Sequence, residues 1–435
     1  MKKIEPRKIM VAVAVIALAF TACPIPMDSP QSSGRLPSLH LSIAPYERGG
    51  PNALHRNIWR DTTVSLSGTP FAFGEVGAQA RGRGNSSWAA MGNKRPLRFR
   101  FRHYVDGVRN DTPRPMFGSS YSAMDWTLIA NAVDHSLMRS YAAYFLGHLL
   151  SGLDFSPARH FLHLYMNGEY RGVYMLSDQM EAGRMGLLAN RGLPPYRNDY
   201  FLEMCHRVPE ENAGYSYVYF IVQGQPFEIR YPGNAIRREG GWDFAKNFMH
   251  MVDAALVSGD VGAISRLIDI PSFIDFYLVQ ELFKNRDVGF SSVFFQIRQV
   301  NGNPKLFAGP LWDFDLSSGS HFNRDWNSDR SPQGAWAATQ NRFFRYLMNT
   351  DWFREKAGAR WSEIRNDEVQ EMIARIRHLS ATYRSCFERN FRRWPNKNVW
   401  VTAPELVRMP FAGQVDFLIN WLERRKVWMD GFLGA

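Results

Sequence analysis

The segment from Glu281 to Gly319 constrains the fold of this chain more than any other part of its sequence. It reads ELFKNRDVGFSSVFFQIRQVNGNPKLFAGPLWDFDLSSG, in which an apolar, helix-like run ends at Lys284 and Asp287 follows. Two strand-like runs then flank Asn301-Gly302, the residue pair that a type I′ turn prefers, so the segment predicts a β-hairpin. Because two strands of similar length fold out and return, the hairpin should bring Asp287 and Asp313 near each other.

Close carboxylates repel each other unless a cation or a proton lies between them. The pair therefore indicates a site for a cation or for proton transfer. The alternative is structural: one acid caps a turn or pairs with Arg286, and the other is a solvated loop residue. We expect a structural role for Asp315, the second acid of the Trp-Asp-Phe-Asp run.

The N-terminus has the pattern of an export signal. Four basic residues precede an apolar run from Ile9 to Ala22, which is short for a transmembrane helix. Cys23 follows Thr21 and Ala22, and this resembles a bacterial lipoprotein signal, in which the cysteine is acylated. We expect residues 1–22 to be a lipoprotein-type signal peptide and the chain to be exported and membrane-anchored through Cys23, at the cell surface or in the periplasm. Plain secretion, an uncleaved anchor and a buried helix are the alternatives.

Residues 23–38 contain four prolines among serines, so we expect a flexible tether there. Composition places the remainder among ordinary globular proteins, with 45% apolar and 21% charged residues. The net charge of +11 suits anionic partners. Nucleic acid is not indicated, because the chain contains no recognisable nucleic-acid-binding module.

The cysteine and histidine patterns do not indicate a metal site. Cys205 and Cys386 could pair outside the cytosol or remain as free, buried thiols. No CxxC motif is present, and the odd spacing of His160 and His163 places their rings on opposite faces of a strand.

Residues 39–125 are rich in short strand-like runs and contain a glycine- and arginine-rich segment, Arg81-Gly-Arg-Gly-Asn-Ser-Ser-Trp88. Its glycines allow backbone N–H groups to approach a ligand, while Arg81, Arg83 and the nearby Lys94 supply positive charge. These are the ingredients of a phosphate-binding loop, although the segment matches neither a Walker loop nor a dinucleotide fingerprint.

Residues 126–435 alternate strands with helices and become helix-rich. We expect a helix that ends near Leu150 and is capped by Asp134 or Ser136, with Arg139 either paired with an acid or facing a ligand. The clearest hairpin spans residues 161–176 across Asn167-Gly168. Further strands are expected at 200–204 and 217–222, and helices at 239–257 and 271–283. The sequence thus predicts one α+β domain over residues 39–435, β-rich to residue 125 and mixed or helical beyond it.

Several of these motifs together resemble the CotH kinase family, named for spore coat protein H. The matching segments, in the family's order, are Arg81–Trp88, Lys94–Phe99, Asp134–Arg139, Leu164–Tyr174, Asn285–Asp287 and Gly309–Asp315. The resemblance implies an atypical protein-kinase-like fold and Mg²⁺-dependent transfer of the ATP γ-phosphate to a serine or threonine hydroxyl.

The resemblance also implies roles for individual residues. Asp287 matches the catalytic aspartate that orients the acceptor hydroxyl, and Asp313 matches the metal-holding aspartate. Arg81, Arg83 and Lys94 would lie near the phosphates, and Asp178 and Gln179 fall where the family places polar residues of the nucleotide site. Five residues after Asp287 the kinase pattern has an asparagine on a second metal ion, and here Ser292, a weaker ligand, takes that position.

Three functions are compatible with these residues. The first is an exported kinase-like phosphotransferase that acts on a surface or coat protein. The second is a catalytically weak or inactive module on the same fold, displayed at the surface for binding or adhesion. The third is a metal-dependent phosphohydrolase, which would use the same acids and release free phosphate.

Overall fold

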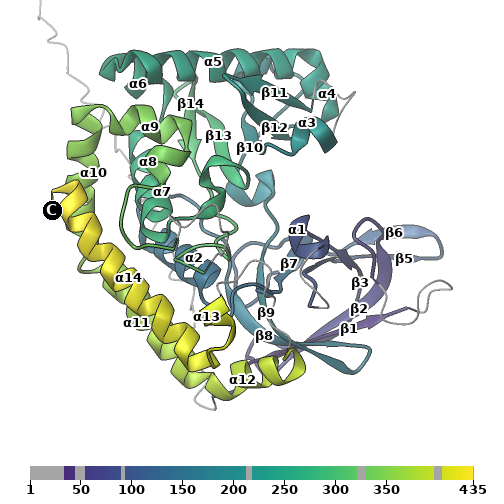
Figure 1. The fold of residues 1–435 in the computed structure, drawn as a ribbon. Helices are drawn as coiled ribbons and strands as arrows, with labels where there is room; N and C mark the ends of the chain where they lie inside the picture. Colours follow the sequence, from purple (N-terminus) through teal and green to yellow (C-terminus); the bar gives the residue numbers. More distant parts are fainter. Residues whose placement is uncertain are drawn as a thin grey trace, which may run out of the picture.

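The computed structural model describes residues 34–44, 54–89, 94–211, 218–320, 330–395 and 404–434. The expected signal peptide, Cys23 and most of the expected tether lie outside these residues. Leu36 is buried and the first strand begins at Ser38, so packed structure starts slightly before residue 39. The described chain is mixed α/β, with sheets in the N-terminal half and helices in the C-terminal half (Figure 1).

The N-terminal half is built on a closed barrel of seven strands. In barrel order these are β1 (Ser38–Ile43), β2 (Arg60–Ser67), β3 (Phe73–Gly82), β4 (Leu97–Arg100), β7 (Asp125–Ile129), β9 (Glu169–Asp178) and β8 (His160–Met166). Neighbours pair antiparallel except β1 and β8, whose parallel pairing closes the barrel. Inward-facing residues of these strands form a core of their own, which includes Leu41, Val64, Ala80, Phe99, Trp126 and Leu164.

The barrel takes three of its strands from the chain at and beyond residue 125, so the β-rich unit extends to Asp178. β8 and β9 form the expected hairpin, and Asn167 and Gly168 both have positive φ, as a type I′ turn requires. A separate small hairpin, β5 (Arg102–Val105) with β6 (Val108–Asp111), follows β4.

A second sheet has five strands, all paired antiparallel. Their order is β11 (Tyr219–Val222), β12 (Gln225–Tyr231), β10 (Tyr200–Met204), β13 (Val293–Val300) and β14 (Asn303–Ala308). The hairpin predicted at Asn301-Gly302 joins β13 to β14, and both turn residues have positive φ. In Figure 1 this sheet lies in the upper part of the molecule and the barrel at the lower right.

Helices surround the second sheet and fill the C-terminal half. The described α-helices are α1 (Ser86–Ala89), α2 (Arg139–Leu149), α3 (Val208–Glu211), α4 (Asn234–Ile236), α5 (Trp242–Ser258), α6 (Val261–Leu267), α7 (Ile270–Phe283), α8 (Ala337–Gln340), α9 (Arg342–Met348), α10 (Asp351–Ile364), α11 (Glu368–Thr382), α12 (Arg384–Arg393), α13 (Pro404–Val407) and α14 (Phe411–Leu433). α5 lies across the second sheet, and α14 packs along α11 (Figure 1). No helix in the described ranges is both long enough and apolar enough to span a membrane.

Helix α7 is buried on all sides, as a helix that is apolar around its whole circumference should be. One ion pair ties it to the C-terminal helix: Arg425 of α14 donates to the carboxylate and the backbone carbonyl of Glu281, and both side chains are fully buried. Glu281 also accepts hydrogen bonds from the backbone N–H groups of Trp336 and Ala338. These contacts fix the end of α7, from which Asp287 follows.

A second buried ion pair resolves the question about Arg139. Its guanidinium lies 2.5 Å from Asp134, and both side chains are almost completely buried. Asp134 also accepts a hydrogen bond from the backbone N–H of Arg139, the first residue of α2. The N-cap position itself is Met138, so the expectation that Asp134 or Ser136 occupies it was wrong. Cys205 and Cys386 are free and buried in the structure.

Candidate active site

A cavity of about 370 Å³ lies between the barrel and the second sheet. Segments far apart in the sequence line it: the glycine-rich segment after β3, the end of β9, strands β10 and β12, and the two ends of the predicted acidic hairpin. Six residues with sequence-predicted roles line it together: Arg81, Arg83, Gln179, Asp287, Ser292 and Asp313. Asp315 lines it as well.

The turn that carries Asp287 is set by the end of α7. Lys284 adopts a left-handed conformation (φ 44°) and its backbone N–H caps the helix. A single 3₁₀ turn, Arg286–Gly289, follows, and the Asn285 side chain accepts a hydrogen bond from the backbone N–H of Asp287 at 3.2 Å. Trp336 Nε1 in turn donates to the Asn285 carbonyl at 2.7 Å. The position of Asp287 is therefore determined by buried contacts on both sides of the turn.

Asp313 and Ser292 face each other across the hairpin. The Ser292 hydroxyl donates to Asp313 Oδ2 at 3.1 Å, and the backbone N–H of Asp313 donates to the Tyr144 hydroxyl at 3.2 Å. Both Asp313 (φ 64°) and Ser292 (φ 59°) have left-handed backbones, which costs a non-glycine residue about 1–3 kcal/mol. Residues strained in this way cluster at functional sites, where the surrounding structure holds them in place.

The pKa values of Asp287, Asp313 and Asp315 are all raised, which means that the charged form of each carboxyl group is unfavourable in this site. Burial, followed by the charge of Asp313, raises the pKa of Asp287 to about 7. Burial also raises the pKa of Asp313, against the opposing charge of Arg83 and the hydrogen bond from Ser292. The pKa of Asp315 is raised well above its ordinary value by burial and then by the charges of Asp313 and Asp287. Without a cation, this group of carboxylates is electrostatically destabilised.

Arg83 supplies positive charge close to Asp313 in the cavity lining. Its guanidinium lies 5.4 Å from the centre of the ring of Trp312, the residue that precedes Asp313. Burial lowers the pKa of Arg83, and the nearby charge of Asp313 partly offsets this effect. Arg81 lies further out: its guanidinium donates to the Arg56 carbonyl at 2.8 Å.

The glycines of this segment are required by close packing. A Cβ atom on Gly84, which has φ of 88°, would lie 2.1 Å from the Ser87 hydroxyl. A Cβ atom on Gly82 would lie 2.1 Å from the ring of Trp88. The chain can therefore follow this path only with glycine at both positions.

The donor set fits a magnesium ion. Asp313, Asp315 and the Ser292 hydroxyl offer only oxygen atoms, the ligands that hard divalent cations prefer. Within the described ranges, no group of three or more His, Cys, Asp or Glu side chains forms a complete metal site. Mg²⁺ commonly binds through one or two carboxylates and completes its shell with waters and substrate phosphates, so the residues present suit it.

Two residues predicted from the sequence do not line the cavity. Lys94 is buried, and its ammonium group donates to the Val173 carbonyl of β9 at 2.7 Å. Burial lowers the pKa of Lys94 to about 7. Asp178 is also buried and accepts hydrogen bonds from Arg184 Nε at 2.8 Å and from the backbone N–H of Ala158 at 2.7 Å. Both side chains have structural partners, whereas Gln179, next to Asp178, reaches the cavity.

The second sheet contributes polar residues that the sequence did not single out. Arg207 lines the cavity, donates to the Ser291 hydroxyl at 3.1 Å, and its charge lowers the pKa of both Asp287 and Asp313. On the same wall, Arg230 pairs with Glu203 and Glu228. The only signal in the sequence was a charged residue within or shortly after a strand, and such residues are too common to be specific. Asp315, for which we expected only a structural role, also lies in the cavity wall.

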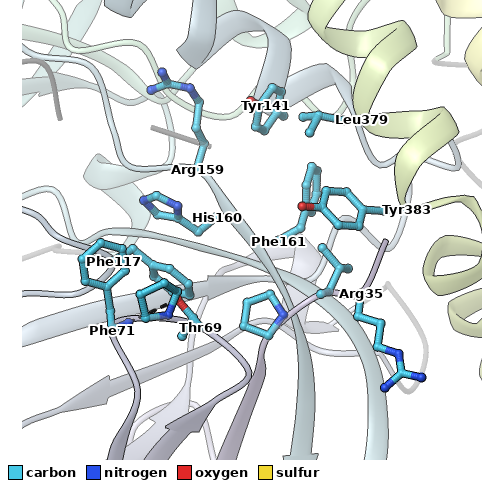
Figure 2. A pocket seen from close by; sticks show the side chains of 13 residues that line it. Arg35, Thr69, Phe71, Phe117, Tyr141, Arg159, His160, Phe161, Leu379 and Tyr383 are labelled. Carbon is cyan, nitrogen blue, oxygen red and sulfur yellow. Dashed lines mark hydrogen bonds between the residues drawn. The ribbon is translucent and has the colours of Figure 1, made fainter. Parts of the chain in front are cut away.

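A smaller cavity of about 150 Å³ lies between the barrel and α11 (Figure 2). Aromatic side chains dominate its lining, and the rings of Phe117 and His160 stack at 4.4 Å. Its described lining contains no aspartate or glutamate. The described lining of this small cavity thus offers no carboxylate to hold a cation or accept a proton. The cavity of about 370 Å³, which contains Asp287 and Asp313, is therefore the candidate active site.

Comparison with known proteins agrees with the motifs. A family model described as CotH kinase protein matches residues 80–429, which is most of the chain. The match begins at the end of β3 and includes every segment that lines the larger cavity except the residues just before β2. No curated protein sequence matches the chain.

Proposed function

This chain belongs to the CotH kinase protein family, and from that premise we propose that it is an atypical, kinase-like phosphotransferase. The proposed reaction transfers the γ-phosphate of ATP to a serine or threonine hydroxyl of a surface or coat protein, with Mg²⁺ as cofactor. We also propose that residues 1–22 direct export and that acylated Cys23 anchors the protein to a membrane. An atypical protein-kinase-like fold is part of the same proposal.

One observation carries the proposal. The cavity combines half-buried carboxylates of raised pKa, Asp287 and Asp313, with guanidinium groups in the same lining, and the charge of one of these, Arg83, acts directly on Asp313. Phosphoryl transfer requires little covalent chemistry from the protein, because alignment and neutralisation of phosphate charge supply most of the catalysis. A site that brings carboxylates able to hold a cation together with arginines able to bind phosphate suits that requirement.

The proposed roles follow from position. Arg81, Arg83 and Gln179 contact the phosphates of ATP, and the glycine backbone at Gly82 and Gly84 admits them closely. Asp313 and Asp315 hold Mg²⁺, with Ser292 positioning the Asp313 carboxylate through its hydrogen bond. When bound, Mg²⁺ would neutralise phosphate charge. Lys94 and Asp178 take no direct part, because their side chains are occupied elsewhere.

Asp287 would orient the acceptor hydroxyl and accept its proton. The hydroxyl oxygen forms a bond to the γ-phosphorus, the bond from that phosphorus to the bridging oxygen breaks, and ADP leaves. Because burial and the charge of Asp313 raise the pKa of Asp287 to about 7, this carboxylate is more basic than an ordinary aspartate and suits the role of a base near neutral pH.

A phosphate-transfer assay tests this proposal. The purified protein is incubated with radiolabelled ATP, Mg²⁺ and a Ser/Thr-rich acceptor mixture, and protein-bound label is separated from free phosphate. We expect transfer by wild type, loss of at least 100-fold in Asp287→Asn and in Asp313→Ala, and no loss in Asp351→Asn, a matched change of an exposed acid on α10.

The other outcomes separate the alternatives. Equal labelling by wild type and both site variants contradicts the proposal. Free phosphate without labelled protein favours a phosphohydrolase. Partner binding that is insensitive to ATP and to both substitutions favours a surface-displayed binding or adhesion module.

A further inference from the structure

A separate cavity, of about 540 Å³, opens beside the β8–β9 hairpin and the start of β4. Its floor consists of side chains of the barrel core, including Leu97, Met166 and Tyr174. Its rim carries three arginines, Arg95, Arg171 and Arg393, and two tryptophans, Trp88 and Trp394. None of the three acids of the candidate active site lines it.

The rim carries an excess of positive charge. Among the described residues, Glu169 is the one carboxylate within ion-pair distance of these arginines, and it contacts both Arg171, at 3.3 Å, and Arg393. Arg95 is exposed and has no ion-pair partner in the described part of the chain. Two of the three guanidinium groups therefore share one carboxylate, and the third has none among the described residues.

The arginines are also held in place. Arg95 lies over the ring of Trp88 at 4.7 Å, and Arg393 lies over the ring of Trp394 at 4.2 Å. The Trp394 indole donates to the Arg171 carbonyl at 2.9 Å. Stacking on an aromatic ring fixes the plane of a guanidinium and reduces the entropy lost when it binds a ligand. The Nε atom of Arg171 is buried and has no hydrogen-bond partner among the described residues, so a donor remains available.

We propose that this cavity is a second anion site, which binds a dianionic phosphate group. Clustered, pre-oriented guanidinium groups recognise the oxygens of phosphate through paired hydrogen bonds. A dianionic phosphate also balances the excess charge of the rim, whereas the lining residues that the structure describes include no carboxylate to hold a cation. The phosphate belongs either to free inorganic phosphate or to a phosphorylated protein side chain.

The same site has a direct contact with the glycine-rich segment. Trp88, on its rim, packs against Gly82, while Asn85 and Ser87 from the same segment line the candidate active site. A phosphate held by Arg95 therefore restrains Trp88 and the segment that ends in it. We expect binding to slow amide hydrogen exchange in residues 82–89.

Calorimetric titration of the purified protein with inorganic phosphate and with a phosphothreonine peptide tests the proposal. We expect at least one of these probes to bind, with affinity about tenfold weaker in Arg95→Gln. Arg83→Gln, in the candidate active site, and Arg377→Gln, an exposed arginine of α11, should leave this binding unchanged. Hydrogen exchange of residues 82–89, with and without the probe, is measured on the same samples.

Each outcome decides the matter. Binding of phosphate alone assigns a free-ion site, and binding of the phosphopeptide assigns a docking site for phosphorylated protein; either supports the proposal if Arg95→Gln weakens it. An absence of binding, binding insensitive to Arg95→Gln, or binding lost in Arg83→Gln would overturn it. Arg95 is exposed, so its substitution should preserve folding, and a thermal melt of each variant verifies this.

Discussion

Replacing Asp287 by asparagine should make the protein more stable at neutral pH and leave it without that advantage in acid. Burial and the neighbouring charge of Asp313 raise the pKa of Asp287 to about 7 in the folded protein, from an ordinary value of 3.8. A carboxyl group whose pKa is higher in the folded than in the unfolded protein contributes to the unfolding free energy only while it is protonated in the folded state. That stabilisation is complete below pH 3.8 and is lost as the pH rises through 7.

The magnitude follows from the displacement of the pKa. About three pKa units at 1.36 kcal/mol each give about 4 kcal/mol between pH 3.8 and 8. This value is an upper limit, because the Asp287 side chain is partly exposed to the cavity. This change in free energy belongs to the three acids together and not to Asp287 alone, since the charge of Asp287 also raises the pKa of Asp315.

Urea unfolding at pH 4, 5, 6, 7 and 8, with EDTA and constant ionic strength, measures the effect. The quantity to compare is the unfolding free energy of wild type minus that of Asp287→Asn, because other titrating groups largely cancel in this difference. It should become more negative by up to about 4 kcal/mol from pH 4 to 8. Asp351→Asn controls for the loss of a carboxylate from the exposed surface. A difference that stays constant across this range would refute the reasoning.

Two further substitutions test residue assignments. Lys94→Met should lower the unfolding free energy by about 1–3 kcal/mol, because it leaves the Val173 carbonyl without its hydrogen-bond donor. The affinity for Mg-ATP should change less than twofold. A large loss of this affinity, measured by calorimetry, would show that Lys94 does belong to the phosphate site. Arg207→Gln should shift the pH profile of kcat/KM to higher pH, because the charge of Arg207 lowers the pKa of Asp287; an unshifted profile would contradict that electrostatic contact.

Local sequence signals predicted the hairpins and the principal helices correctly. Asn167-Gly168 and Asn301-Gly302 both occupy positive-φ turns, and no other dipeptide signals this turn more strongly. The second of these hairpins also brought Asp287 and Asp313 to one cavity, as expected from the chain returning on itself. These features depend on residues close in sequence, so they can be predicted from the sequence alone.

Features that depend on distant residues were not predictable in this way. The barrel closes through the parallel pairing of β1 with β8, more than 100 residues apart, and nothing local specifies that pairing. The cavity wall formed by Glu203, Arg207 and Arg230 likewise depends on how the second sheet packs against the barrel.

The positions of Lys94 and Asp178 illustrate the same limit at the level of single side chains. A lysine near a glycine-rich segment is a reasonable phosphate ligand, but a carbonyl of β9, 79 residues further along the chain, accepts its hydrogen bond instead. Asp178 and Gln179 are adjacent, yet Asp178 is buried against Arg184 and Gln179 reaches the cavity. The direction of each side chain is set by tertiary packing.

Calorimetric titration with Mg-ATP, comparing wild type, Asp313→Ala and the exposed control Asp351→Asn, tests the central claim most directly. If Asp313 helps to hold a nucleotide-bound Mg²⁺ in the cavity, wild type and the control should bind equally, and Asp313→Ala should bind at least about tenfold more weakly, a difference of about 1.4 kcal/mol. Equal affinity in all three proteins, or no binding by wild type, would contradict the assignment of this cavity as a nucleotide site.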